Sequence, residues 1–330
     1  MQNGIKLLGI KVTNECNLHC YMCGQRKLRN QEKQQIDFEK ICNVIDELRG
    51  RSKYEVFLWG GEPFLYKEII PLIQYIKSQK LQLTINTNGT YLEEYAQSLV
   101  DCNVNRVIVS IDGSRELHDE IRGVQGTYQK VMKGVHKINE LKNVRPFVTA
   151  NIVVTSRNYK YITEIVNELY QQGIHYIELQ LPIYISNKMG ERYQYILEKE
   201  FGIKAEKWKG YQGDYFDVDV DCLLRQLRRL PAYTRIVPAL SESLIIQYFQ
   251  GRNECVLEKG CCKVPFEQVR IEANGDVVIC PDFPDVVIGN ILIQDIDEIL
   301  NSELLGNFKR YIRRYGKIPI CDKCVMYYEA

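Results

Sequence analysis

The chain of 330 residues lacks the features that mark several common classes of protein. Its 43 basic residues are balanced by 42 acidic ones, and the net charge of +1 gives no electrostatic case for nucleic acid or an anionic membrane as partner. No apolar run approaches the roughly 18 residues of a membrane-spanning helix, and the N-terminus has no signal-peptide pattern. We therefore expect a cytoplasmic protein with no nucleic-acid partner and no membrane partner.

Cysteine, in contrast, is abundant, with 12 residues in the chain. Without an export signal the thiols are expected to stay reduced, and a chain of this length needs no disulfide staples. Hydrophobic residues at 45% and charged residues at 26% describe an ordinary globular protein with a substantial core. Clustered cysteines in this setting indicate metal binding or catalysis.

The first half of the chain alternates between apolar, β-branched runs and amphipathic helical patterns. The predicted strands cover residues 7–13, 54–60, 81–89, 105–113, 147–155 and 175–183. The predicted helices lie near residues 37–49, 65–80, 91–100, 127–142 and 159–172. This alternation predicts an α/β fold with a parallel sheet wrapped by helices, but periodicity does not separate an open sheet from a barrel.

Unusual motifs follow the first four predicted strands: "CNLHCYMC", "WGGEP", "NTNGT" and "SIDGS". In parallel α/β proteins, ligands bind and reactions occur at the C-terminal ends of the strands. We therefore expect the four motifs to meet at one shared mouth.

The second half of the chain is organised differently. Residues 184–250 are polar and aromatic, with helices predicted around 189–200 and 218–230, and form either a surface excursion or an insert that covers substrate. Cysteines return with Gly and Pro over residues 251–330, which predicts a small separate module. The expected domains therefore begin with residues 1–183, followed by the insert and the module.

Three cysteines, Cys16, Cys20 and Cys23, lie within one short loop. Soft thiolate ligands suit zinc and iron–sulfur clusters. Zinc requires a fourth ligand, and His19 in that role would demand a very tight loop. A [4Fe–4S] cluster on three cysteines instead leaves one iron open, where a small molecule can bind.

The loop "CNLHCYMC" resembles the CxxxCxxC loop of the radical S-adenosylmethionine (SAM) superfamily. Further motifs agree with that family in order: "GGEP" at residues 60–63, "SIDG" at 110–113 and "HDEIRG" at 118–123. The resemblance covers roughly residues 7–183 and implies a partial (β/α)6 TIM-like barrel. It also implies a [4Fe–4S] cluster on the three cysteines, which binds SAM through its open iron. Reductive cleavage of SAM would give a 5′-deoxyadenosyl radical that removes a hydrogen atom from substrate.

The resemblance further implies which residues contact SAM. The backbone of "GGEP" would meet the amino group, and its glycines would permit the close approach. Ser110 and Arg122 would contact the carboxylate, a role for which a guanidinium is suited. Met22 stands where the family often has an aromatic residue and would pack against the adenine. The implied cosubstrate residues are Met22, Gly60, Gly61, Glu62, Pro63, Asn88, Ser110, Asp112 and Arg122.

The C-terminal segment holds a second set of cysteines. "RIEANGDVVIC" predicts a hairpin with an Asn-Gly turn and Cys280 at its far end. With Cys262 before the hairpin and the CxxC pair Cys321 and Cys324 after it, the segment resembles the auxiliary-cluster domain SPASM. Because the longer form carries more cysteines after the CxxC, we expect the shorter Twitch form, with one extra cluster. This resemblance implies a small α+β domain that holds a second [4Fe–4S] cluster on the four cysteines.

Two alternatives stay open in this segment: which metal the cysteines bind, and which cysteine is the first ligand. Four cysteines in two groups also suit a structural zinc ribbon. Cys261 or Cys255 is an alternative to Cys262 as the first ligand. Together with Cys222, these two are also candidate hydrogen-atom donors, with simple packing as the other interpretation. The remaining cysteines, which fall in or beside helical patterns and are expected to pack, are Cys42 and Cys102.

A fully ligated second cluster has no open iron, so its expected role is to transfer an electron. Oxidation of the substrate radical would give an oxidised alcohol or a new bond, whereas quenching by a cysteine would give epimerisation. The first predicted strand begins near the N-terminus, which argues against a leader-binding domain and favours a small polar substrate such as a sugar, aminocyclitol or nucleoside. The alternatives are maturation of a ribosomally made peptide, by epimerisation or cross-linking, and a non-enzymatic iron–sulfur or zinc-binding scaffold. An electron donor such as flavodoxin or ferredoxin is the expected partner.

Overall fold

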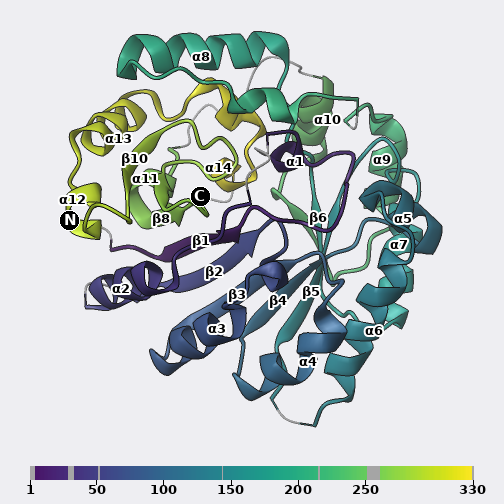
Figure 1. The fold of residues 1–330 in the computed structure, drawn as a ribbon. Helices are drawn as coiled ribbons and strands as arrows, with labels where there is room; N and C mark the ends of the chain where they lie inside the picture. The colour runs from purple at the N-terminus through teal and green to yellow at the C-terminus, as the bar shows by residue number, and fades with distance from the viewer. Residues whose placement is uncertain are drawn as a thin grey trace.

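The computed structural model describes residues 4–28, 33–50, 53–142, 144–214, 216–250 and 261–328. Within these ranges, ten strands form one sheet in the order β10-β9-β8-β1-β2-β3-β4-β5-β6-β7 (Figure 1). The strands of the first half are β1 (Leu7–Thr13), β2 (Glu55–Gly60), β3 (Gln82–Thr87), β4 (Arg106–Ser110), β5 (Phe147–Val153) and β6 (Ile177–Gln180). All six are parallel neighbours, which confirms the predicted parallel α/β arrangement.

The predicted helices cover the outer face of this sheet (Figure 1). They are α2 (Phe38–Arg49), α3 (Ile69–Ser78), α4 (Leu92–Asp101), α6 (Thr127–Glu140) and α7 (Ile162–Gln171). On β4, Val107 and Val109 are fully buried, whereas Arg106, Ile108 and Ser110 on the opposite face are only half-buried. Successive side chains of a strand point to opposite faces, so the sheet has an apolar outer face and a more polar inner one. The strand order is linear, and the barrel is therefore partial and unclosed.

A seventh parallel strand, β7 (Thr234–Val237), extends the sheet beyond β6. It comes from the segment for which only helices were predicted. The strand has only four residues, too few for a periodic pattern, and it lies between Pro231 and Pro238. Pairing with β6 therefore stabilises the extended conformation of these residues. The other elements of this segment are α8 (Asn187–Phe201), η2 (Lys207–Tyr211), α9 (Val220–Leu227) and α10 (Glu242–Gln250). Short helices that were not predicted are α1 (Gly24–Leu28), η1 (Pro63–Leu65) and α5 (Arg115–Arg122).

The C-terminal residues share this sheet instead of forming a separate one. Strand β8 (Gln268–Ile271) pairs in parallel with β1 and turns into the antiparallel β9 (Asp276–Val278). Gly275 takes φ +86° in that turn, a conformation that glycine adopts without strain, and the predicted hairpin is confirmed. The remaining elements are α11 (Val264–Glu267), β10 (Val287–Asn290), α12 (Ile296–Leu300), α13 (Glu303–Tyr315), η3 (Pro319–Lys323) and α14 (Val325–Tyr328).

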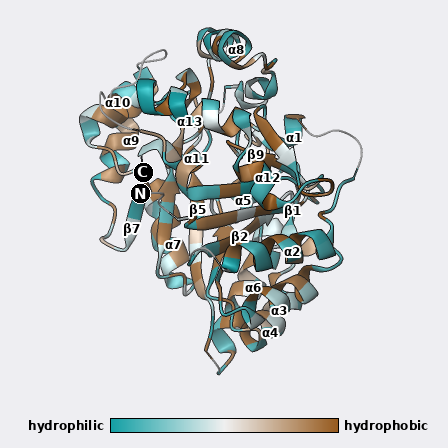
Figure 2. Ribbon diagram, turned by 90° about the vertical axis from the view of Figure 1, so that its left-hand side faces the viewer, coloured by the Kyte–Doolittle hydropathy of each residue, from teal (hydrophilic) through white to brown (hydrophobic). Residues whose placement is uncertain are grey.

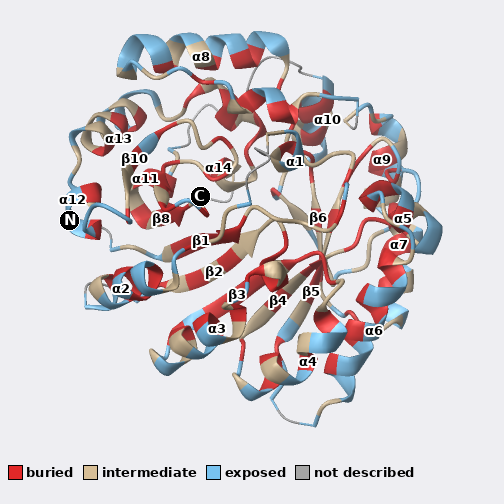
Figure 3. Cartoon of the chain, viewed as in Figure 1, coloured by how far each residue is buried: buried red, intermediate tan, exposed pale blue. Residues whose placement is uncertain are grey.

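Apolar residues gather on the sheet and on the helix sides that face it, and hydrophilic residues lie outward (Figure 2). The buried residues follow the same distribution, with exposed positions on the outer helix surfaces (Figure 3). In the described part of the chain, no helix is long and apolar enough to cross a membrane. A functional site is therefore expected at the sheet edge where the parallel strands end.

Candidate functional site

The cysteine loop leaves β1 at this edge and is surrounded by the ends of the next strands. Cys20 is buried, whereas Cys16 and Cys23 are half-buried. The side-chain amide of Asn88, after β3, lies 3.8 Å from the Cys16 sulfur and donates to Asn17 Oδ1 at 2.9 Å. The structure thus brings the strand-end motifs together around the loop, as expected.

The two glycines of "GGEP" lie against the backbone of the cysteine loop. The Gly61 and Glu62 amides donate to the carbonyls of Thr13 and Glu15 at 2.8 and 2.7 Å. A Cβ atom would stand 2.4 Å from the Thr13 oxygen at Gly60 and 1.9 Å from the Glu15 oxygen at Gly61. The glycines of "GGEP" thus also allow the backbone of the cysteine loop to pack directly against this motif.

We expect Gly61→Ala to lower the free energy of unfolding by about 1–3 kcal/mol, because a backbone atom blocks the added methyl group. Urea unfolding measures the change. Gly50→Ala is the matched control, since Gly50 ends α2 at φ −69° with nothing within 4 Å of an added Cβ. The control should change stability by no more than about 0.5 kcal/mol. Equal stability of the two variants would contradict the close contact.

Glu62 joins the ends of β2 and β3 through a fully buried carboxylate. The carboxylate accepts hydrogen bonds from Thr87 Oγ1 and the Asn88 amide, both at 2.7 Å, and from the Phe64 amide at 3.2 Å. Burial raises the pKa of Glu62 to about 7, although these hydrogen bonds act in the opposite direction. The side chain is therefore engaged by protein groups, which leaves the backbone as the part able to face a ligand.

The raised pKa makes stability depend on pH at Glu62. Between the ordinary carboxyl value of 4.5 and about 7, the folded chain holds a proton that the unfolded chain releases. Stability therefore falls as pH rises through this window. Glu62→Gln removes the titration, and we expect its loss of unfolding free energy between pH 5 and pH 8 to be smaller than that of the wild type by about 2 kcal/mol. Urea unfolding at both pH values tests this, and parallel curves would refute it.

Arg122 and Asp112 form a buried ion pair beside Cys20. The Arg122 Nη2 atom is 2.5 Å from Asp112 Oδ2, and Nη1 is 3.7 Å from the Cys20 sulfur. Burial raises the pKa of Asp112 and of Cys20, and the guanidinium opposes both shifts. Among the described residues, the buried Nε atom of Arg122 has no hydrogen-bond partner. This N–H remains available to an anionic ligand.

The end of α5 holds the middle of the cysteine loop. The His19 amide donates to the Arg122 carbonyl at 3.0 Å, and the Tyr21 amide donates to the Ile121 carbonyl at 3.2 Å. Gly123 ends the helix at φ +72°, where an added Cβ would be 2.8 Å from the His19 oxygen. The glycine of "HDEIRG" is thus required both for the left-handed backbone and for space.

The zinc alternative at the loop would need His19 as its fourth ligand. The His19 side chain is exposed, whereas its neighbour Cys20 is buried. Over the described ranges, no three His, Cys, Asp or Glu side chains are placed to hold a single metal ion. A zinc ion needs ligand atoms within about 2.3 Å of one point, whereas a cubane spreads its ligands over several irons.

The other implied cosubstrate residues lie at the same mouth. Met22 is half-buried and packs against the core, and Pro63 begins η1. Ser110 ends β4 directly opposite Asn151 of β5. The Asn151 amide donates to Gln180 Oε1 at 3.1 Å, which places two further polar side chains on the inner face. Sequence reasoning missed these two, although a polar residue inside an apolar strand was the available signal.

The four preferred auxiliary ligands line one cavity. They are Cys262, Cys280, Cys321 and Cys324, and the other lining residues are Val264, Ile279, Phe283, Phe308, Ile312, Ile318, Ile320 and Met326. Cys261 does not line the cavity and is exposed, with its sulfur 3.8 Å from the Ile312 carbonyl oxygen. Cys255 lies outside the described residues. Cys222 lies on α9, which packs against α7 and α10.

The chemistry of this cavity fits an iron–sulfur cluster. Burial raises the pKa of Cys280 well above its usual range and that of Cys324 to about 12. A hydrogen bond with Cys262, together with burial, raises the pKa of Cys321 well above its usual range. Thiolates in such an apolar cavity require nearby positive charge, which cluster irons would supply.

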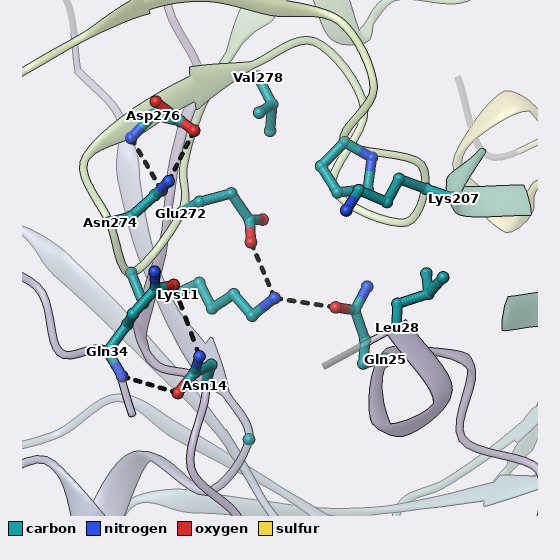
Figure 4. A pocket seen from close by; sticks show the side chains of 13 residues that line it. Lys11, Asn14, Gln25, Leu28, Gln34, Lys207, Glu272, Asn274, Asp276 and Val278 are labelled. Carbon is teal, nitrogen blue, oxygen red and sulfur yellow. Dashed lines mark hydrogen bonds and ion pairs between the residues drawn. The ribbon is translucent and has the colours of Figure 1, made fainter. Parts of the chain in front are cut away.

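A polar pocket of about 170 Å³ lies between the C-terminal hairpin and residues on either side of the cysteine loop, such as Asn14 and Gln25 (Figure 4). Lys11, only 8% exposed, extends its ammonium from β1 into this pocket. It lies 2.8 Å from Glu272 Oε2 and donates to Gln25 Oε1 at 2.8 Å. One buried lysine therefore connects the barrel, the residues after the cysteine loop and the hairpin.

Tyr211, from η2, contacts the residues that follow both cysteine sets. An added Cβ on Gly24 would be 2.7 Å from its ring, and the ring of Phe283 lies 4.8 Å away between centroids. The hydroxyl accepts from Gln25 Nε2 at 3.2 Å and also hydrogen-bonds Asp282. Burial raises the pKa of Tyr211 well above its usual range. A single aromatic side chain thus bridges the loops after Cys23 and Cys280, a contact that the sequence did not reveal.

Comparison with known proteins agrees with this arrangement. Residues 10–169 match the radical SAM superfamily model, and residues 261–325 match the SPASM model of an iron–sulfur cluster-binding domain. Among curated proteins, an AdoMet-dependent heme synthase of Methanosarcina barkeri (strain Fusaro / DSM 804) is 30% identical over 166 residues, or 50% of this chain and 47% of that protein. The chain spans about half the length of the curated relatives it matches.

Solved structures share the fold at low sequence identity. SuiB of Streptococcus suis, bound to the precursor peptide SuiA, superposes with a TM-score of 0.68 at 17% identity, over 97% of this chain and 71% of that one. BtrN in complex with AdoMet and 2-DOIA gives a TM-score of 0.51 at 15% identity, over 98% and 93%. The two matched domains imply [4Fe–4S] clusters, with SAM as cosubstrate. The chain therefore carries a radical SAM domain at residues 10–169 and a C-terminal SPASM domain at residues 261–325.

Proposed function

We propose that this chain is a radical SAM oxidoreductase that oxidises a small polar substrate. In this proposal the loop cysteines hold the open cluster, and Cys262, Cys280, Cys321 and Cys324 hold a closed auxiliary one. When bound, the open cluster and SAM supply a 5′-deoxyadenosyl radical that removes a hydrogen atom from a carbon. The observation that carries the proposal is the contrast between three cysteines on a loop at the strand ends and four inside an apolar cavity.

The residues of the chain have distinct parts in this proposal. Arg122 would orient the SAM carboxylate through its remaining Nε–H, and Asp112 would hold the guanidinium in place. Ser110 lies at the same strand end and would add a hydroxyl. Glu62 would fix the two strand ends so that the backbone of "GGEP" faces the SAM amino group.

The inner face of the barrel supports a polar substrate. Arg106 lies 2.9 Å from Glu178 and hydrogen-bonds Thr149 at 3.0 Å, and the Asn151–Gln180 pair lies nearer the mouth. Such a wall offers charges and amides to hydroxyl and amino groups of a sugar, aminocyclitol or nucleoside. A peptide backbone presents hydrogen-bonding groups of the same kind, and SuiB was crystallised with a precursor peptide, so peptide maturation is the second candidate.

Oxidation is favoured over epimerisation by the position of two cysteines. Epimerisation requires a hydrogen-atom donor close to substrate. Cys222 lies on α9, which packs against α7 and α10, and Cys261 is exposed, with its sulfur 3.8 Å from the Ile312 carbonyl of α13. Cys255, the third candidate donor, lies outside the described residues. On the two that are described we favour an auxiliary cluster that accepts an electron as the outlet for the substrate radical, and flavodoxin or ferredoxin would reduce the open cluster.

Cleavage of SAM is the first test. The anaerobically reconstituted protein, reduced with dithionite, should convert SAM to 5′-deoxyadenosine. Absence of this product from protein with about eight irons per chain, the content of two [4Fe–4S] clusters, would leave only the scaffold interpretation.

Substrate class and outcome need a second test. Pools of polyols, aminocyclitols and nucleosides should accelerate 5′-deoxyadenosine formation, whereas unstructured peptides should not. Stimulation by peptides alone would favour peptide maturation. In deuterium oxide, oxidation leaves the substrate carbon without solvent deuterium, whereas epimerisation by a cysteine introduces it.

A further inference from the structure

We propose that Arg270 and Lys323 are built-in countercharges of the auxiliary cluster and that they raise its reduction potential. The inference rests on the proposed function, because it takes the four cavity cysteines as ligands of an iron–sulfur cluster. Both cations come from the elements that carry these ligands or pack beside them.

Arg270 projects from β8 and is 93% buried. Its Nε and Nη2 atoms donate to the Gln268 side-chain oxygen at 3.0 and 2.6 Å, and Nη2 also lies 3.6 Å from the sulfur of Met326, a residue of the cavity wall. Within the described residues, no carboxylate lies within 4.0 Å of this guanidinium. The charges of Asp282, Cys280 and Cys324 act on this guanidinium.

The position of Arg270 depends on the barrel. Gly9 of β1 pairs with Arg270 across the sheet, and a Cβ on Gly9 would stand 2.3 Å from Arg270 Nη1. The missing side chain on β1 therefore makes room for the guanidinium at the junction between barrel and auxiliary cavity. Asp282 interacts with this charge from the loop after Cys280, and burial raises the pKa of its carboxyl to about 6.

Lys323 lies between the two cysteines of the CxxC pair and is 99% buried. Its Nζ atom is 4.4 Å from the ring centroids of both Tyr184 and Tyr248, and it donates to the Tyr248 carbonyl. The Tyr248 hydroxyl in turn donates to the Pro182 and Lys323 carbonyls at 2.8 and 3.2 Å. Two aromatic faces thus hold the ammonium of a residue that directly precedes the ligand Cys324 in the chain, by cation–π attraction.

Electrostatics gives these two charges a consequence for the cluster. A buried cation is costly unless negative charge lies nearby, and a [4Fe–4S] cluster on four thiolates is negatively charged. Reduction adds one more negative charge, so neighbouring cations stabilise the reduced form more than the oxidised form. The apolar wall of the cavity screens this attraction poorly. The two residues therefore favour acceptance of an electron from a substrate radical.

A redox titration followed by electron paramagnetic resonance tests the inference. The full-length chain without the three loop cysteines gives the signal of the auxiliary cluster alone, and the titration is repeated on the unsubstituted enzyme. Arg270→Met and Lys323→Met should each lower the midpoint potential, so that at a fixed solution potential the ratio of reduced to oxidised cluster falls roughly tenfold. Arg270→Lys and Lys323→Arg keep the charge and should restore most of the difference.

Arg313→Met is the matched control. Arg313 lies on α13 and is exposed, with its guanidinium 5.1 Å from the ring of Phe266, so the substitution removes the same charge where solvent screens it. The midpoint potential of the auxiliary cluster in this control variant should equal that in the chain with Arg313. An equal shift in this control would overturn the inference, because net charge and not burial would then be responsible.

The remaining outcomes are also decisive. An intact auxiliary cluster with unchanged potential in both methionine variants would overturn the inference and leave the proposed function standing. Zinc in place of iron in the auxiliary site would overturn both. If Arg270→Met loses the cluster, Lys323→Met decides, and an unchanged midpoint potential in that variant would overturn the inference.

Discussion

Replacing Cys16, Cys20 and Cys23 together by alanine is expected to reduce 5′-deoxyadenosine formation to the background of protein-free controls. The three thiols are the ligands that the proposed function assigns to the open cluster, and Asn88 and Arg122 each place a donor beside one of them. Without these ligands, SAM has no iron to bind. High-performance liquid chromatography of the anaerobic reaction measures the loss.

Iron content separates loss of one site from collapse of the protein. The triple variant should keep about four of about eight irons per chain, the content of one [4Fe–4S] cluster. The auxiliary cavity is closed by residues of the C-terminal segment and shares no cysteine with the loop. Loss of all iron would contradict two independent sites.

A second triple variant controls for the removal of three thiols. Cys42 is buried in α2, Cys102 ends α4 and Cys222 lies on α9, and none of these helices carries a cysteine of the two candidate sites. Replacing these three by alanine should leave both iron content and 5′-deoxyadenosine formation unchanged within about twofold. A strong loss of product with full iron would assign one of them a part in catalysis.

Arg122→Met is expected to destabilise the protein by about 3–5 kcal/mol, the cost of leaving a buried charge without its partner. Asp112 is fully buried and keeps its carboxylate 2.5 Å from Arg122 in the unsubstituted chain. The variant also loses the donor to Cys20 and the proposed contact to the SAM carboxylate. Anaerobic urea unfolding of the cluster-free chain measures the stability term without any contribution from cofactor binding.

Adding Asp112→Asn to the variant should return a substantial part of the lost stability. The asparagine removes the unpaired charge, and its side-chain oxygen can still accept from the Val153 amide, which donates to Asp112 at 2.9 Å. The two substitutions are therefore expected to be non-additive, as for residues in direct contact. Additive losses would show that Arg122 stabilises the chain through packing and not through the ion pair.

The alternation of strands and helices was predictable because its periods are local properties of the sequence. Six strands and seven helices, among them α8 and α9, were predicted within a few residues of their observed bounds, and the Asn-Gly turn before Asp276 predicted the hairpin. Strand β7 was not predicted. It has only four residues, which are too few to show a period, and it depends on β6 for its pairing. The junction of β8 with β1 was equally invisible, because it joins segments about 260 residues apart.

Some features of the candidate site could likewise be predicted from the sequence, and others could not. The spacing of Cys16, Cys20 and Cys23 indicated a cluster loop because ligands close in sequence are close in space. The glycines of "GGEP" were recognised, but their contact with the loop backbone was not, since sequence does not show which surface a glycine faces. Arg122 alone reads as an ordinary surface charge, and only the folded chain shows it buried against Asp112.

The sequence by itself determined the family, the parallel α/β order and the two sets of cysteines, because these reside in spacing and periodicity along the chain. Only the tertiary structure decided that Cys262 and not Cys261 lines the auxiliary cavity, that Tyr211 bridges the two cysteine sets, and that Arg270 and Lys323 are buried beside one of them. Burial and charge pairing depend on which distant segments pack together and exclude water. No local pattern encodes that information.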